Sequence, residues 1–211
     1  MPSKKAPKFV TKQVRKVYAS APEAKKHIDD IADTLAEKIG GKVAKTPLKN
    51  VERAIQKVHD KYRDDASKLT DIARNTVVSD NPKMFQHHVD SLKSYKGTKE
   101  FEFREASSDP LGYSGANFKI KTPNGHIAEI QVNTPEMIYA KEPEETTRNI
   151  LGDKEYERVK EKVGGIESGK GHKYYEKWRV MKFQDPTNPD IAKLEEESRN
   201  YYGEINKRYY S

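Results

Sequence analysis

Two acidic residues, Asp71 and Glu129, stand in segments whose patterns predict β-strands. Asp71 begins DIARNTVVSD, which has a β-branched centre, and Glu129 lies in HIAEIQVNT, which alternates apolar and polar residues. Two carboxylates from different strands are an oxygen-ligand pair that suits Mg²⁺ beside phosphates. The types of residue therefore suggest a magnesium site at Asp71 and Glu129. On sequence alone, an acid at the start of a strand is also a common cap or turn residue.

A run of cations precedes Asp71. In LKNVERAIQKV the basic residues Lys49, Arg53 and Lys57 recur every four positions, so on a helix they form one stripe. No acid stands at the i±4 positions within the stripe to relieve the repulsion. One interpretation is the solvated face of an ordinary amphipathic helix. The other is a site for a triphosphate, whose charge must be neutralised before a nucleophile approaches.

The polar face around Glu129 belongs to a predicted hairpin. A loop of three residues, 123–125, aligns the apolar residues of 117–122 with those of 126–134, and Pro and Gly suit such a loop. This register makes Lys119 the cross-strand neighbour of Glu129 and leaves Asn117 and Gln131 nearby. The cluster is either an organised site or an ordinary wet sheet face, where a Lys–Glu pair contributes about a few tenths of a kcal/mol.

The elements that must position these residues follow from periodicity and punctuation. We expect an α+β fold with a small mixed sheet of about four to five strands flanked by helices. Strands are predicted at 71–80, 99–106, 117–122 and 126–134, with 42–46 a short strand or a connection. Helices are predicted at about 21–39, 48–66, 82–95, 135–148, 153–163, 170–183 and 189–210. The predicted domains are a basic arm at 1–20, a helix at 21–41, a catalytic domain at 42–185 and a C-terminal helix at 186–211.

The composition excludes several classes. Of 211 residues, 34% are apolar and 35% charged, which predicts one modest core, and no apolar run reaches membrane-spanning length. There is no cysteine, so disulfides and thiolate metal sites are excluded. We expect a cytoplasmic protein with no membrane partner, or a domain that crosses an oxidising compartment and reaches the cytoplasm of a target cell. Of the net charge of +7, residues 1–20 supply six charges, because the remainder carries 34 basic against 33 acidic residues. Such an arm is either a solubilising, partly disordered end or a contact for RNA.

Five motifs in order resemble one known family. They are Lys49-x-x-x-Arg53-x-x-x-Lys57, DIARNTVV from Asp71, GYSGANF from Gly112, EIQVNTPEM from Glu129 and GHKYYE from Gly171. Together, over about 42–180, they resemble the RelA/SpoT-type alarmone synthetase domain, a nucleotidyltransferase-like fold. The likeness is greatest to small toxin members, found in toxin–antitoxin pairs or as interbacterial effectors. The length leaves no room for an alarmone hydrolase domain.

The resemblance implies a pyrophosphokinase. Such an enzyme transfers the β,γ-pyrophosphate of ATP to the 3′-hydroxyl of a purine nucleotide and releases AMP. It implies Mg²⁺ on Asp71 and Glu129, the two catalytic residues, with Glu129 also helping to deprotonate the hydroxyl. It places the ATP phosphates on Lys49, Arg53, Lys57 and Arg74. It assigns acceptor binding to Tyr113, Asn117, Lys119, Gln131 and His172, with Tyr113 stacking on the base.

Two departures from the family pattern leave the acceptor open. Members that make guanosine alarmones commonly read GYxSxH and EIQIRT, whereas this chain has Gly115 and Asn117 in the first motif and Asn133 in the second. The acceptor is therefore an ADP- or GDP-class nucleotide, giving (p)ppApp or (p)ppGpp, or the 3′ end of a tRNA, whose modification would block translation. A third hypothesis is a non-catalytic RNA- or protein-binding module. A growth-inhibiting toxin of this type would have a cognate antitoxin or immunity protein.

Two of the acceptor residues also have plain structural interpretations. Tyr113 could pack on the core where its loop enters the sheet, because stacking on a base needs an exposed ring. His172 could be an ordinary helix residue with a satisfied hydrogen bond. The lone Trp178 and the tyrosine pairs of the C-terminal part are expected to pack long helices onto the domain, or to form an interface for the neutralising partner.

Overall fold

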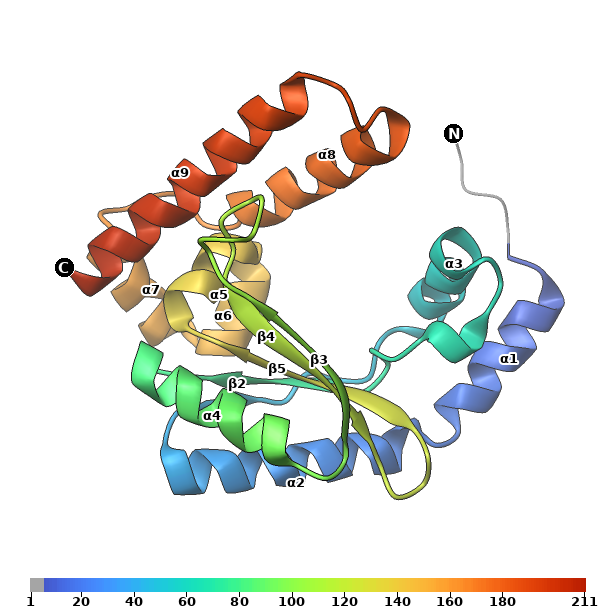
Figure 1. Cartoon of the computed structure of the whole chain (residues 1–211). Coiled ribbons are helices and arrows are strands. Elements are labelled where there is room, and N and C mark those ends of the chain that lie inside the picture. Colours follow the sequence, from blue (N-terminus) through green and yellow to red (C-terminus); the bar gives the residue numbers. More distant parts are fainter. Residues whose placement is uncertain (1–5) are drawn as a thin grey trace. The chain divides into compact units, whose positions relative to one another are not determined.

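The computed structural model describes residues 6–211, which form helices and five strands (Figure 1). The strands are β1 (Lys42–Ala44), β2 (Arg74–Val78), β3 (Thr98–Arg104), β4 (Gly115–Lys121) and β5 (Ile127–Asn133). The helical elements that precede β3 in the chain are α1 (Lys8–Tyr18), α2 (Ala21–Ile39), α3 (Val51–Tyr62), the 3₁₀ turn Ala66–Lys68 and α4 (Pro82–Ser94). The later helices are α5 (Pro135–Lys141), α6 (Glu144–Leu151), α7 (Asp153–Lys162), α8 (Lys170–Gln184) and α9 (Asp190–Tyr210).

The five strands form one mixed sheet in the order β1-β2-β5-β4-β3. Strands β2 and β5 run parallel: the Glu129 amide donates to the Ala73 carbonyl, and the Ser79 amide to the Asn133 carbonyl, so both strands advance together. The bond from the Lys121 amide to the Gly97 carbonyl joins opposite ends of β3 and β4 and makes that pair antiparallel. The predicted α+β class with a small mixed sheet is confirmed.

The hairpin between β4 and β5 has the predicted loop of three residues. The Thr122 amide donates to the His126 carbonyl, and the Gly125 amide donates to the Thr122 carbonyl. Gly125 has φ +83°, the left-handed conformation that glycine adopts without steric cost. Counting back from Thr122 and His126 places Lys119 opposite Glu129, as predicted. The apolar residues that alternate along one face of the two strands are buried, namely Ala116, Phe118, Ile120, Ala128, Ile130 and Val132.

Two predicted helices differ from the observed ones. The helix expected at 48–66 is shorter because the side chain of Asn50 caps the Arg53 amide at 3.0 Å and Arg63 adopts the left-handed conformation. The helix expected at 135–148 is two helices, α5 and α6. Pro143, between them, lacks an amide hydrogen and cannot continue a helix from α5.

The chain forms two compact units, and each is described separately. The first comprises the described residues up to Val77, with His87–Phe101 and Asn117–Gln131. The second comprises Val78–Gln86, Glu102–Ala116 and Val132–Ser211. Because the strands of the sheet run from one unit into the other, segments far apart in the sequence meet in each.

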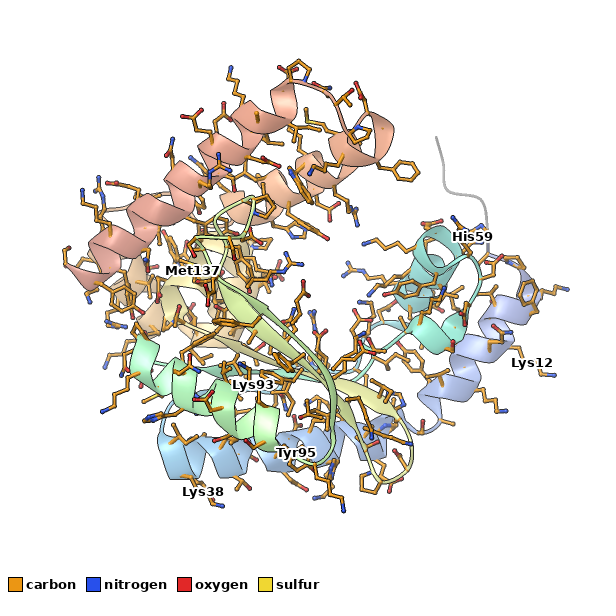
Figure 2. The ribbon with its side chains drawn as sticks, viewed as in Figure 1. Lys12, Lys38, His59, Lys93, Tyr95 and Met137 are labelled. Carbon is orange, nitrogen blue, oxygen red and sulfur yellow. The ribbon has the colours of Figure 1, made fainter. Side chains whose placement is uncertain are left out.

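In the first unit, α1 packs on α3 (Figure 1). Val10 and Val14 of α1 are fully buried with Ala54 and Val58 of α3. Residues 8–18 of the predicted basic arm are therefore a packed helix, and the expectation of a disordered end is wrong for them. Residues 1–5 lie outside the described part. The basic side chains of α1 lie on its solvent side, and Lys12 is labelled there in Figure 2.

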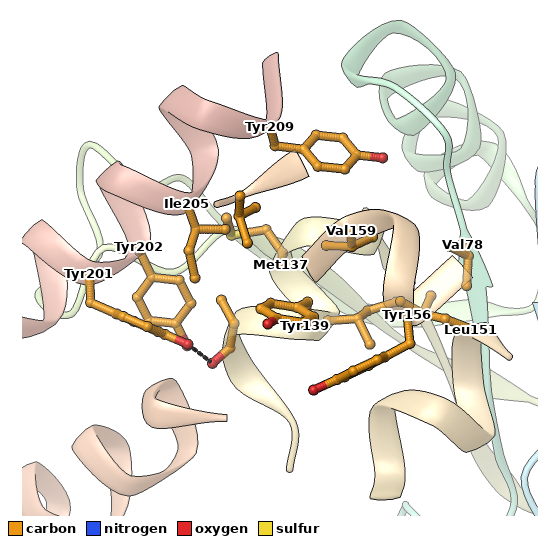
Figure 3. Packing of buried hydrophobic residues seen from close by; sticks show 13 residues of the cluster. Val78, Met137, Tyr139, Leu151, Tyr156, Val159, Tyr201, Tyr202, Ile205 and Tyr209 are labelled. Carbon is orange, nitrogen blue, oxygen red and sulfur yellow. Dashed lines mark hydrogen bonds between the residues drawn. The ribbon is translucent and has the colours of Figure 1, made fainter. Parts of the chain in front are cut away.

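In the second unit, tyrosines from α5, α7 and α9 build much of the core (Figure 3). The rings of Tyr139 and Tyr156 lie 5.2 Å apart, and Tyr201 donates a hydrogen bond to the Ala140 carbonyl at 3.1 Å. A buried tyrosine hydroxyl needs a hydrogen-bond partner, and the Ala140 carbonyl supplies one for Tyr201. The prediction that the C-terminal tyrosines pack long helices is correct for Tyr201, Tyr202 and Tyr209, which are all buried.

Among the described residues, no helix is both long enough and apolar enough to span a membrane.

Candidate active site

Asp71 is the centre of a compact charged cluster in the first unit. Its Oδ2 atom accepts one hydrogen bond from Lys49 Nζ and another from Lys57 Nζ, each at 2.8 Å. The three side chains are only 13%, 24% and 23% exposed, respectively. Lys49 precedes α3, Lys57 lies within α3, and Asp71 precedes β2. The pairing therefore depends on the fold of this unit.

The cluster carries a strong electrostatic signature. Burial alone would raise the pKa of the Asp71 carboxyl, but the hydrogen bonds from Lys49 and Lys57 outweigh it and hold that pKa below its ordinary value. Burial tends to lower the pKa of Lys57, and the bond to Asp71 reverses this and raises it. Asp71 and Lys57 are therefore charged at neutral pH, and the cluster holds two cations around one anion.

One oxygen of Asp71 has no partner. Its Oδ1 atom is buried and accepts no hydrogen bond from any residue between 6 and 211. A buried carboxylate oxygen without a partner costs free energy unless a ligand satisfies it. Among the described side chains, no group of three or more His, Cys, Asp and Glu is placed to hold a metal ion. Mg²⁺, however, commonly binds through one or two carboxylates and completes its shell with water and phosphate, so Asp71 fits that type of site.

The predicted stripe of three cations on one helix is wrong for Lys49. Lys49 precedes the first residue of α3, and its amide donates to the Ile72 carbonyl at 2.9 Å. Its carbonyl accepts a hydrogen bond from the hydroxyl of Tyr18 on α1. Arg53 and Lys57 do share a stripe, but Arg53 is exposed and its guanidinium has no partner in the described chain. Lys49 and Lys57 thus converge on Asp71 while Arg53 is free to bind an anion.

Glu129 is half-buried on the polar face of β5, also in the first unit. Its amide donates to the Ala73 carbonyl at 3.0 Å, two residues after Asp71 in the chain. Its Oε1 atom accepts a hydrogen bond from Gln131 Nε2 at 2.6 Å. The amide of Gln131 therefore orients the carboxylate, which supports the predicted association of these two residues.

The other predicted residues of the first unit have different surroundings. Lys119 pairs with Glu100 of β3, with Nζ 2.5 Å from Oε2, so its ammonium is neutralised by a residue that the sequence analysis did not consider. Asn117 is half-buried, opposite Gln131 in the register of the hairpin. Arg74 is exposed at the first residue of β2.

Tyr113 and His172 belong to the second unit. His172 is exposed in the first turn of α8. The ring of Tyr113 is half-buried and packs against the core of this unit. Its centre lies 5.9 Å from the centre of the Tyr202 ring, in an edge-to-face arrangement, and 5.3 Å from the Lys141 ammonium. Its hydroxyl accepts a hydrogen bond from Asn133 Nδ2 at 2.7 Å. Tyr113 thus packs on the core, as its structural interpretation proposed, and still exposes part of its ring.

Sequence reasoning missed the supporting residues. Tyr18, which binds the backbone of Lys49, lies in the segment that was taken for an arm. Asn133 was read only as the loss of an arginine, although it binds Tyr113. A signal was present for Tyr18: the pattern Val10, Val14 and Tyr18 places apolar side chains four residues apart, as in a packed helix.

The chain is similar to one toxin over most of its length. It is 46% identical to the (p)ppApp synthetase toxin Tas1 of Pseudomonas aeruginosa (strain UCBPP-PA14) over 192 residues, 91% of this chain and 42% of Tas1. The fold also matches a chain in the crystal structure of the complex between the type VI effector Tas1 and its immunity protein, with 45% sequence identity and a TM-score of 0.84. The match covers 93% of this chain and 97% of that one. The chain belongs to the Tas1 family. It spans less than half the length of the full Tas1 sequence.

The resemblance to alarmone synthetases read from five short motifs is thereby confirmed. A more distant similarity is to the small alarmone synthetase 1 of Bacillus subtilis bound to its product pppGpp, with 14% identity and a TM-score of 0.48 over 92% of this chain and 89% of that one. No family model matches the chain.

Proposed function

We propose that this member of the Tas1 family is an ATP-dependent pyrophosphokinase that makes (p)ppApp. It would transfer the β,γ-pyrophosphate of ATP to the 3′-hydroxyl of an adenosine nucleotide and release AMP. The identity to the (p)ppApp synthetase Tas1 supports the reaction and its adenosine acceptor. The observation that carries the proposal is the cluster of Lys49, Asp71 and Lys57, which combines two cations for phosphate with a carboxylate oxygen that lacks a partner.

The cluster can exchange its partners when nucleotide binds. Phosphate oxygens of ATP would accept the hydrogen bonds that Lys49 and Lys57 now donate to Asp71, and the exposed Arg53 and Arg74 would add further cations. Asp71 would then be free to hold Mg²⁺ together with Glu129. When bound, Mg²⁺ neutralises charge on the phosphates as pyrophosphate is transferred. Lys49 and Lys57 start with an anionic partner, so these two ammonium groups are compensated while the site is empty.

Glu129 is the candidate general base. Its carboxylate would accept the proton of the attacking 3′-hydroxyl, and the hydrogen bond from Gln131 would hold it in one orientation. Tyr113 and His172 are the residues of the second unit that we propose to contact the acceptor. Lys119 forms an ion pair with Glu100, and we propose no role for it in nucleotide binding.

The test is an assay of AMP release with purified chain, ATP and Mg²⁺. Separate reactions contain ADP, GDP or deacylated tRNA as acceptor, and mass spectrometry identifies the species that gains pyrophosphate. We expect AMP and a pyrophosphorylated adenosine nucleotide from the wild type, and no AMP from Glu129→Gln. The matched control Glu37→Gln removes a carboxylate from the exposed face of α2 and should leave the rate unchanged. Absence of AMP with every acceptor would overturn the proposal, and transfer to tRNA alone would replace its acceptor.

The biological role follows the same relative. We propose that the chain inhibits growth when it reaches the cytoplasm of a bacterium, and that a cognate immunity protein neutralises it, as Tas1 has an immunity protein. Expression of the wild type in a bacterium should arrest growth, and expression of Glu129→Gln should not. Equal toxicity of the two would mean that growth inhibition does not depend on the transferase activity.

A further inference from the structure

Two tyrosines of the first unit contact the two lysines of the Asp71 cluster, each in a different way. The hydroxyl of Tyr18, the last residue of α1, donates a hydrogen bond to the backbone carbonyl of Lys49. The ring of Tyr62, the last residue of α3, lies under the ammonium group of Lys57, with Nζ 5.3 Å from the ring centre. Each lysine that donates to Asp71 is therefore also held by a tyrosine.

The backbone of Lys49 is fixed at both of its polar groups. Its amide donates to the Ile72 carbonyl at 2.9 Å, and its carbonyl accepts from Tyr18. A lysine side chain is long and flexible, so fixing its backbone limits the positions that the ammonium group can reach. Tyr18 is in turn held by α1, whose Val10 and Val14 are buried against α3. The packing of α1 therefore bears on the position of a cation in the site.

The Tyr18 hydroxyl is a hydrogen-bond donor at neutral and moderately alkaline pH. Burial, and then the negative charges of Asp71 and Glu52, raise the pKa of Tyr18 to about 12. The neutral phenol keeps its proton and donates it to the Lys49 carbonyl, whereas a phenolate would repel that oxygen. Phenylalanine at this position would keep the ring and lack only the hydrogen bond.

The ring of Tyr62 is fixed at the end of α3. Arg63, the next residue, has φ 51° and ends the helix in the left-handed conformation. The ring is half-buried and packs against the apolar cluster of this unit. A cation within about 6 Å of a ring centre is attracted to the face of the ring. Because the ring carries no charge, it holds Lys57 and leaves the charge of the ammonium group available to phosphate.

We propose that Tyr18 and Tyr62 are positioning residues that hold Lys49 and Lys57 where the phosphates of ATP bind. This inference rests on the proposed function. Neither contact involves an atom of Asp71, so both persist when phosphate oxygens replace this carboxylate as the partner of the lysines. Tyr18 acts through its hydroxyl on the Lys49 backbone, and Tyr62 acts through the face of its ring on the Lys57 ammonium.

The test removes the hydroxyl and the ring separately and measures KM and kcat. Tyr18→Phe should raise the KM for ATP about 5-fold, as for the loss of one hydrogen bond. Tyr62→Phe keeps the ring and should behave as wild type, whereas Tyr62→Leu should raise the KM for ATP about 3-fold. In each variant kcat should be unchanged, because a contact that is equal in the ground state and the transition state affects KM alone. The matched control, Tyr95→Phe, removes a hydroxyl that lies 3.1 Å from His27 Nε2 in the same unit, and it should keep the wild-type KM for ATP.

Double variants separate the positioning of the lysines from a general loosening of the fold. In the Lys49→Met background, Tyr18→Phe should cause no further rise in the KM for ATP, because the ammonium group that Tyr18 positions is absent. In the Lys57→Met background, Tyr62→Leu should likewise cause no further rise. A loss of stability alone would raise the KM equally with and without the lysine.

Calorimetric titration of ATP into the same variants carrying Glu129→Gln measures binding without turnover. The Kd for ATP should rise in Tyr18→Phe and Tyr62→Leu by the same factors as the KM. The inference is overturned for a tyrosine whose variant binds ATP as tightly as its parent, or whose effect persists in full without its lysine. If the wild type binds ATP but releases no AMP with any acceptor, the proposed function fails instead, and the titration still tests the positioning.

Discussion

Lys57 and Asp71, fourteen residues apart in the chain, form a partly buried ion pair in which Nζ lies 2.8 Å from Oδ2. Lys49, which precedes α3 in the chain, donates to the same oxygen. One carboxylate thus compensates two cations that the proposed reaction needs for phosphate.

Asp71→Asn should weaken the fold as well as the proposed chemistry. It leaves two partly buried ammonium groups without an anion, which costs about 2–3 kcal/mol after an allowance for their partial exposure. Urea denaturation measures this loss, and AMP release should fall below detection. The control Asp30→Asn removes an exposed acid from α2 and should leave the stability close to that of wild type. A stability equal to that of wild type would contradict the ion pairs.

Sulfate or ATP should rescue part of that stability. If phosphate replaces Asp71 as the partner of Lys49 and Lys57, an anion binds the folded Asp71→Asn variant and raises its melting temperature. Replacement of both Lys49 and Lys57 by Met should abolish this rise in melting temperature. An equal rise in both would mean that the anion binds elsewhere.

Lys57→Met and Arg53→Met should separate the two kinds of cation. Both should raise the KM for ATP by about 10-fold or more, since each removes a charge from the phosphates. Only Lys57→Met should also change the stability of the empty protein, because Arg53 is exposed and has no carboxylate partner in the described chain. Lys12→Met, on the solvent side of α1, is the control for a general loss of charge. An unchanged KM in Arg53→Met would remove it from the site.

Acidification should destabilise the hairpin through His126. The ring is buried, with Nδ1 3.0 Å from the Ser20 hydroxyl oxygen and Nε2 without a partner among the described residues. Burial lowers the pKa of His126 below its ordinary 6.5, so the unfolded chain takes up a proton first as the pH falls. The stability that neutral His126 contributes is therefore present above pH 6.5 and is lost below it.

The measurement is the free energy of unfolding at about pH 8 and about pH 5. The difference should be smaller in His126→Gln than in wild type, because the variant has no imidazole whose pKa burial lowers. His87→Gln, at an exposed position of α4, should leave the difference unchanged. Equal pH dependence of all three proteins would contradict the attribution of the acid sensitivity to His126.

Removal of residues 1–20 should destabilise the first unit rather than act as a clean test of RNA binding. The deletion exposes the apolar surface that Val10 and Val14 cover on α3 and removes Tyr18 from Lys49. The better test of a tRNA acceptor is the triple substitution of Lys12, Arg15 and Lys16 by Gln. It should leave stability and reaction with ADP unchanged, and it would impair only an RNA acceptor, whose affinity depends on phosphate neutralisation.

Local patterns were sufficient for most elements and for the hairpin. The alternation in HIAEIQVNT and the turn chemistry of Pro123, Asn124 and Gly125 predicted the register that places Lys119 opposite Glu129. These are short-range preferences, so neighbouring residues suffice to express them. The same logic erred at Lys49, where spacing alone suggested one helix and the cap at Asn50 excluded it.

The contacts that give these residues their chemistry were decided elsewhere. The oxygen of Asp71 meets Lys49 and Lys57, and the hydroxyl of Tyr113 meets Asn133, across 14 to 22 residues of intervening chain. Hydrogen-bond geometry at 2.7–2.8 Å depends on how α1, α3 and the strands pack, and periodicity contains no information on that distance. Lys119 illustrates the difference: its place in the register was predictable, but its choice of Glu100 over Glu129 required the neighbouring strand β3. Residue types and their order were enough to indicate phosphate chemistry, whereas only packing in three dimensions determined which charges meet.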